Sequence, residues 1–161
     1  MSPVDPNLLE ALAHGIKSEV ASYVFYTEAI KKEEAQPFRD ALEKLAYEEK
    51  DHFHILERQY DSLVRSERWI STADILKQEG LPEINEEMTQ QHRELMDEVA
   101  RAGSLREVLD IAYRLEEEAF ELFDGQAKQT DSPEAKKMFT ELAKFERGHM
   151  ELINRMITES A

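Results

Sequence analysis

Four segments of this chain place apolar residues in steps of three and four, and glutamate or histidine residues interrupt each series at corresponding places. Residues spaced in this way lie along one side of an α-helix, so each segment is expected to form a bundle helix with an inward-facing row, here termed a seam. The four seams are Leu12, Ile16, Glu19, Tyr23, Tyr26, Ile30; Phe38, Leu42, Leu45, Glu49, His52, Leu56; Leu105, Leu109, Ala112, Glu116, Phe120, Phe123; and Phe139, Leu142, Glu146, His149, Ile153, Met156.

The first two seams are predicted to form a helix hairpin. Asp5 followed by Pro6 is typical of a helix start, and the first helix is expected to reach about Ala35 before Gln36-Pro37 separates it from the second. Glu19 lies about 16 residues before this turn and Glu49 about 13 residues after it. At ~1.5 Å per residue, their carboxylates lie at nearly the same height.

The last two seams are predicted to form a second hairpin. Ser104 and Glu107 match a capping box that opens its first helix, and Asp131-Ser132-Pro133 forms the turn before its second. We expect an all-α antiparallel four-helix bundle in a single domain over residues 1–161. A long crossover over residues 60–103 would link helices two and three, with a short helix near 72–79, a stop at Gly80 and an acidic helix over about 84–101.

The two hairpins are related by an internal repeat with an offset of 97 residues. Without a gap, the offset carries Glu19 to Glu116, Tyr26 to Phe123, Glu49 to Glu146 and His52 to His149. Only six of the 39 positions from 19 to 57 are identical to their counterparts, yet three of those six are seam glutamates or histidines. The sequence therefore predicts a duplicated unit that carries Glu on one helix and Glu-x-x-His on the next.

These repeated acidic and imidazole groups predict a metal centre. A helical Glu-x-x-His places a carboxylate and an imidazole side by side, and an unpaired carboxylate in a bundle core costs several kcal/mol. A buried ion pair would explain one such glutamate, but six groups at repeat spacing favour two hard-to-borderline metal ions. The chain has no cysteine, which excludes disulfides, thiolate metal sites and a cysteine nucleophile.

Composition excludes other classes of function. The net charge of -15 and pI near 4.7 would repel nucleic acid and anionic membrane surfaces. The sequence has no run of ~18 apolar residues that could span a bilayer, and its first residues lack the pattern of a signal peptide. We expect a cytoplasmic protein with neither nucleic acid nor membrane as a partner. His14 and His54 lie off the seams and are expected to face solvent.

The duplicated ligand set resembles the ferritin-like di-iron carboxylate superfamily, and most closely the rubrerythrin-like domains. The resemblance implies two iron ions, with manganese or a mixed pair suiting the same ligands. It implies that Glu49 and Glu146 bridge the ions, and that Glu19, Glu116, His52 and His149 are terminal ligands. Two features depart from rubrerythrins: the cysteine-ligated rubredoxin module is missing, and Tyr113 replaces an additional glutamate one turn before Glu116.

The resemblance also implies a reaction. We expect an oxidoreductase that reacts with peroxide or dioxygen and takes electrons from a separate donor protein or reductant. Ferritin-type iron storage, a di-iron oxygenase or hydroxylase, and a non-catalytic scaffold are the alternatives. Tyr26 would either hydrogen-bond a ligand carboxylate or simply pack in the core, and the exposed faces of the bundle suggest a homodimer.

Overall fold

The computed structural model describes residues 4–160, and within this range the regular structure is entirely helical, which confirms the predicted fold class. None of the described helices combines the length and apolar character needed to cross a membrane. The elements are α1 (Pro6–Ala29), the 3-10 helix η1 (Glu33–Phe38), α2 (Arg39–Ser66), α3 (Thr72–Leu76), α4 (Glu86–Gln90), α5 (Arg93–Arg101), α6 (Leu105–Gln129) and α7 (Pro133–Glu159).

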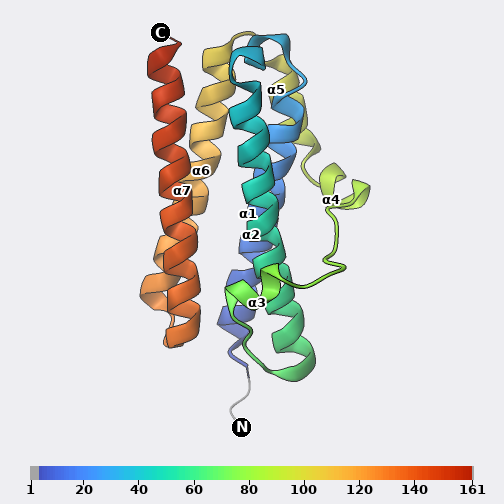
Figure 1. Cartoon of the computed structure of the whole chain (residues 1–161), viewed down its shortest axis with the longest axis vertical. Coiled ribbons are helices and arrows are strands. Elements are labelled where there is room, and N and C mark those ends of the chain that lie inside the picture. The colour runs from blue at the N-terminus through green and yellow to red at the C-terminus, as the bar shows by residue number, and fades with distance from the viewer. Residues whose placement is uncertain (1–3, 161) are drawn as a thin grey trace.

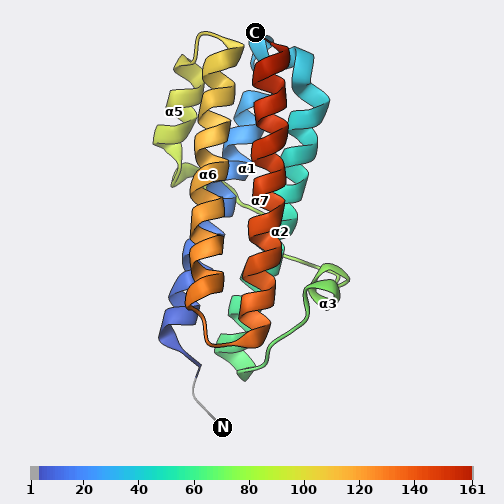
Figure 2. The same cartoon turned by 90° about the vertical axis from the view of Figure 1, so that its left-hand side faces the viewer.

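The four long helices form two antiparallel hairpins that lie against each other. Figure 1 shows the α1/α2 hairpin on one side and the α6/α7 hairpin on the other, with the start of α1 and the end of α7 at opposite ends of the bundle. The crossover returns the chain to the end where α2 began, so α2 and α6 run in the same direction. Figure 2 shows α3 beside α2 and α5 near α1 and α6, so the crossover wraps around the first hairpin.

Side-chain caps fix the starts of three long helices where the sequence predicted them. Asp5 Oδ1 accepts a hydrogen bond from the backbone N–H of Asn7 at the start of α1. Ser104 Oγ accepts from the Glu107 N–H at the start of α6, and Ser132 caps α7 in the same way. Each oxygen satisfies a backbone donor in the first turn that has no partner within the helix.

Helix α1 is shorter than predicted, because it ends at Ala29 instead of near Ala35. Lys32 adopts an extended backbone conformation, and the chain then forms the 3-10 helix that contains Pro37. The Gln36 side-chain amide donates to the carbonyls of Ile30 and Lys32. The Gln36 side chain thus satisfies backbone carbonyls that a longer helix would otherwise pair. The apolar periodicity of the sequence does not reveal such a contact.

The crossover also differs in detail from the prediction. Helix α2 continues to Ser66, where Glu67 takes a left-handed backbone conformation with φ of 55°, so the connection begins after the predicted residue 60. The predicted acidic helix over 84–101 is interrupted by a turn at residues 91 and 92, which separates α4 from α5. Gly80 has a φ of 68° and lies in the predicted break after α3.

Two buried polar side chains of α2 attach the crossover to the bundle. The Gln59 amide donates to the Ile70 carbonyl at 2.7 Å and accepts from the Ile70 N–H at 3.0 Å. His54 Nε2 lies 2.9 Å from the Pro82 carbonyl oxygen, and the residue is only 8% exposed. The expectation that His54 faces solvent is therefore wrong, because the crossover covers its side of α2.

The core of the bundle is divided into two main apolar clusters. One contains Phe25, Tyr26, Leu45 and Ile153, among others, and lies toward the end where α6 begins. The other includes Leu12, Leu56, Phe123 and Phe139 and lies toward the opposite end. The charged seam residues occupy the levels between them along the seams, so apolar packing encloses the buried charges from above and below.

The tight approach of α1 to its neighbours generates a stability prediction. A Cβ on Gly15 would lie 2.9 Å from Leu56 Cδ1 and 3.1 Å from Phe123 Cε1, whereas a Cβ on Gly125 would meet nothing within 4 Å. Gly15→Leu should lower the free energy of unfolding by about 1–3 kcal/mol through overpacking. Gly125→Ala, the matched control, should raise it by about 0.5–1 kcal/mol. Urea unfolding measures both, and a Gly15→Leu protein as stable as wild type would contradict the packing described.

Candidate metal centre

All six predicted seam ligands come together at the centre of the bundle. The four glutamates are completely buried, and the two histidines are no more than 5% exposed. Each of the four long helices supplies at least one of them. Their side chains form two groups whose potential ligand atoms lie within 4.8 Å of one another: Glu19, Glu49, His52 and Glu146; and Glu49, Glu116, Glu146 and His149.

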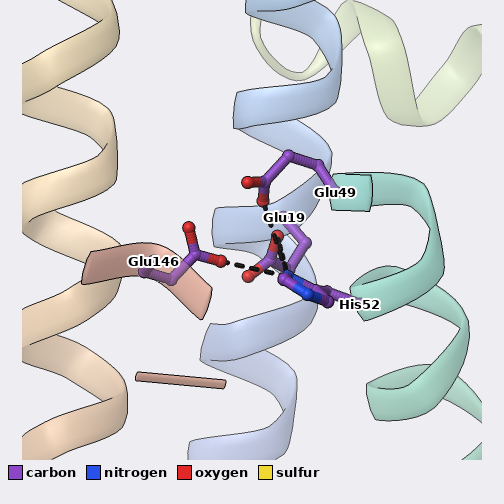
Figure 3. Close-up of side chains that lie close together, drawn as sticks. All are labelled: Glu19, Glu49, His52 and Glu146. Atoms are coloured by element: carbon purple, nitrogen blue, oxygen red, sulfur yellow. Dashed lines mark hydrogen bonds and ion pairs between the residues drawn. The ribbon is translucent and has the colours of Figure 1, made fainter. Parts of the chain in front are cut away.

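The first group is shown in Figure 3, where the three carboxylates point toward the His52 ring. His52 Nδ1 lies 3.1 Å from Glu146 Oε1, 3.7 Å from Glu19 Oε2 and 3.9 Å from Glu49 Oε2. The nitrogen therefore faces oxygens from α1, α2 and α7 together. Spacing along the first hairpin predicted the meeting of Glu19 with Glu49, and the bundle adds Glu146.

The second group repeats this arrangement around His149. Its Nδ1 lies 2.7 Å from Glu49 Oε1, 3.3 Å from Glu116 Oε2 and 3.3 Å from Glu146 Oε2. Again the Nδ1 atom is the one turned toward the carboxylates. The rings of His52 and His149 are nearly parallel, with centroids 6.0 Å apart and an angle of 16° between their planes.

Glu49 and Glu146 belong to both groups, whereas each of the other four residues belongs to one. Two carboxylates shared between two sets of ligand atoms are the arrangement that a pair of neighbouring cations requires, because each shared group can offer one oxygen to each ion. The repeat in the sequence thus corresponds to an approximate two-fold relation within the site.

Unsatisfied oxygens support the same interpretation. Both carboxylate oxygens of Glu19, both of Glu49 and Oε2 of Glu146 are buried without a hydrogen bond of acceptable geometry. A buried acceptor without a partner costs roughly 1–3 kcal/mol, and more if it is charged. Carboxylate and imidazole ligands suit iron, manganese and similar divalent ions, so the residues present fit a two-metal centre.

Burial governs the ionisation of the carboxylates when no metal balances their charge. Burial raises the pKa of Glu19 well above its usual range, and the carboxylates of Glu146 and Glu49 raise it further. Burial likewise raises the pKa of Glu116, with added repulsion from Glu49 and Glu146. Burial therefore favours the protonated forms of these two carboxyls, and a metal ion that binds here would displace such protons.

The pKa values of Glu146 and His149 shift in the directions that favour their charged forms. Burial would raise the pKa of Glu146, but hydrogen bonds with Glu116, His149 and His52 lower it well below its usual range. Burial would also lower the pKa of His149, yet its hydrogen bonds with surrounding glutamates raise it far above that of free histidine. The ionised form of Glu146 and the protonated form of His149 thus stabilise each other inside the cluster.

Tyr26 contributes a hydrogen bond to the site from the first helix. Its hydroxyl donates to Glu116 Oε1 at 2.6 Å, and the side chain is fully buried. Of the two interpretations left open by the sequence, contact with a carboxylate of the cluster is the one observed. The repeat equivalent is Phe123, which has no hydroxyl and packs in the apolar cluster beside Phe139, so the two halves of the site differ here.

Sequence reasoning missed Glu48, which lies immediately before Glu49 on α2. Its Oε2 lies 2.7 Å from Nε2 of His149, the ring nitrogen that points away from the cluster. Glu48 lies off the seam and its side chain keeps 30% of its surface exposed, so the apolar periodicity does not mark it. A comparison of repeat equivalents could have found it, since the offset of 97 pairs Glu48 with the apolar Phe145.

Tyr113 lies at the position where the resemblance implied an additional glutamate. It is partly buried and packs against the apolar cluster that contains Phe25 and Leu45. The cluster therefore consists of the four seam glutamates and two histidines, without a further carboxylate from this turn of α6.

The fold and the buried cluster together define a ferritin-like helical bundle with a candidate two-metal carboxylate site. Comparison with protein families gives a match to the family model described as Rubrerythrin over residues 10–157, nearly the whole chain. The chain therefore belongs to the rubrerythrin family, as the duplicated ligand motif indicated. No curated protein and no solved structure gives a significant match to it.

The electrostatics of the metal-free cluster generate a prediction for Glu19→Gln. The folded-state pKa of Glu19 is raised above its usual value of 4.5, so its contribution to stability is present below pH 4.5 and is lost as pH rises through the folded-state pKa. Gln carries no charge and can donate to the neighbouring carboxylates. In a chelator, Glu19→Gln should therefore melt at a higher temperature than wild type, by a margin that grows with pH.

Thermal unfolding at a series of pH values with and without added ferrous iron measures this margin. Glu10→Gln, on the exposed side of α1, is the matched control and should follow wild type throughout. Addition of iron under anaerobic conditions should reverse the order, because only wild type keeps the full carboxylate set. A Glu19→Gln protein that melts below wild type in chelator at neutral pH would contradict the account.

Proposed function

We propose that this protein binds two iron ions and acts as an oxidoreductase toward peroxide or dioxygen. The observation that carries the proposal is the pair of buried ligand groups that share Glu49 and Glu146. Membership of the rubrerythrin family supports iron as the metal. Manganese or a mixed pair would suit the same ligand types, and metal analysis of the purified protein distinguishes them.

In this proposal each residue of the cluster has a distinct role. Glu49 and Glu146, which belong to both ligand groups, would bridge the two ions. Glu19 and His52 would complete one metal position, and Glu116 and His149 would complete the other. Four ionised carboxylates carry four negative charges, which equals the charge of two divalent cations. Metal binding would thus remove the repulsion that burial imposes on the metal-free cluster.

Two ferrous ions held there would supply the two electrons that reduce one peroxide molecule, with two protons, to two water molecules. Side chains of this protein would orient the ligands for this chemistry. Tyr26 holds one oxygen of Glu116 by its hydroxyl, which fixes the orientation of that ligand and leaves the other oxygen to face the site. The apolar clusters lie above and below the site, and Glu48 accepts a hydrogen bond from the Nε2–H of His149.

Electrons for repeated turnover would come from outside this chain. Because the sequence has no cysteine, it cannot hold the thiolate-ligated iron that serves rubrerythrins with a rubredoxin module. A separate electron-donor protein or small reductant is therefore part of the proposal. The homodimer and the cytoplasmic location stay predictions from the sequence.

The ligand roles predict that each chain binds two iron ions, and that loss of a shared carboxylate lowers this number. Wild-type protein incubated anaerobically with ferrous iron and then desalted should retain two iron atoms per chain. Glu49→Ala should retain less than half as much, because the missing carboxylate belongs to both groups. Glu43→Ala, on the exposed side of the same helix, should match wild type. Equal and negligible iron in wild type and Glu49→Ala would instead favour a scaffold without a functional site.

The proposed reaction predicts rapid oxidation of the bound iron. Peroxide mixed with the ferrous protein in a stopped-flow spectrophotometer should oxidise the iron faster than it oxidises the same concentration of free ferrous ion. Parallel experiments with dioxygen identify the preferred oxidant. Oxidation no faster than that of free iron with either oxidant would reject the oxidoreductase.

A further inference from the structure

The residue before each shared glutamate contacts the histidine of the other hairpin. Glu48 precedes Glu49 on α2 and reaches His149 on α7, with 2.7 Å between Oε2 and Nε2. Phe145 precedes Glu146 on α7 and reaches His52 on α2, with ring centroids 5.1 Å apart at an angle of 64°. The two contacts are therefore equivalent under the repeat, but one is anionic and the other is aromatic.

The chemistry of the two imidazoles differs as a result. Both rings turn Nδ1 toward the carboxylates, so a metal bound by Nδ1 requires that Nε2 carry the proton. Glu48 accepts a hydrogen bond from that N–H in His149. In the described residues, His52 has no hydrogen-bond partner at Nε2, and its neighbour Phe145 is 55% exposed.

A carboxylate that accepts a hydrogen bond from a ligating imidazole fixes the tautomer and ring orientation and makes the metal-binding nitrogen a stronger donor. Loss of such a partner typically costs 10–100-fold in metal affinity or activity. Because Glu48 keeps 30% of its side-chain surface exposed, solvent screens part of its charge, and we take the lower end of this range.

We propose that Glu48 is a positioning residue that makes the two metal positions unequal, so that the position at His149 holds its divalent ion more tightly than the position at His52. This inference rests on the proposed two-metal centre. The His52 position, beside the exposed Phe145 ring, is then the one that fills last and empties first. Glu49 and Glu146 would then keep one ion as a shared partner while the ion at the His52 position exchanges.

Calorimetric titration of the metal-free protein with Co²⁺ alone tests the inequality without any turnover. Wild type should bind two ions in two steps whose dissociation constants differ by about tenfold or more. Glu48→Gln should weaken the tighter step about tenfold and leave the weaker step unchanged, so that the two steps approach each other. Glu43→Gln removes one charge from the exposed side of the same helix and should leave both steps unchanged.

A second pair of variants separates this role from a merely structural link between α2 and α7. His149→Gln should remove the tighter step, and Glu48→Gln added to it should have no further effect on the remaining step. Circular dichroism establishes that each variant keeps its helical content. The visible absorption of the bound Co²⁺ should change in Glu48→Gln for the first ion only, because only that ion has His149 as a ligand.

The outcomes distinguish this inference from the function on which it rests. Two ions of equal affinity in wild type, or a Glu48→Gln variant with both steps unmoved, would overturn the inequality while the two-metal centre stood. An equal effect of Glu48→Gln with and without His149 would also overturn it. Wild type that binds fewer than two ions would contradict the metal centre and the inequality together.

Discussion

Four carboxylates buried in the middle of a helical bundle are the constraint on which the structure depends. Each buried ion costs several kcal/mol even after relaxation, whereas a fully buried apolar side chain contributes about 1.5–3 kcal/mol. A cluster of four glutamates and two histidines thus offsets the gain from a comparable number of core residues. The protein places apolar clusters on both sides of this layer, and two divalent ions would neutralise it.

The crossover allows a duplicated hairpin to close around one site. Because α2 and α6 run in the same direction, the two hairpins face each other with an approximate two-fold relation, and Glu49 and Glu146 meet at its centre. Gln59 and His54 fasten the crossover to α2 through backbone groups of Ile70 and Pro82. The repeat thus provides matched ligands, while positions at which its two copies differ, such as Glu48 and Phe145, make the halves unequal.

Most of the fold and all six cluster residues could be predicted from the sequence. Buried apolar residues recur with the period of a helix, so a charged residue at one of these positions is easy to recognise. Glu19 and His149, for example, are ionisable residues at positions where the seams are otherwise apolar. The apolar periodicity does not identify Glu48, because a half-buried acidic residue beside a seam has the same sequence pattern as a solvent-exposed one. The end of α1 at Ala29 and the burial of His54 depend on side-chain-to-backbone contacts that periodicity does not contain.

Two metal ions held between the hairpins would explain why this bundle buries a layer of charge. A crystal structure of the iron-loaded protein, with anomalous diffraction measured at the iron absorption edge, tests this explanation most directly. We expect two peaks about 3.5–4 Å apart, with Glu49 and Glu146 contacting both. A single peak, peaks only at surface carboxylates, or none inside the bundle would contradict the explanation.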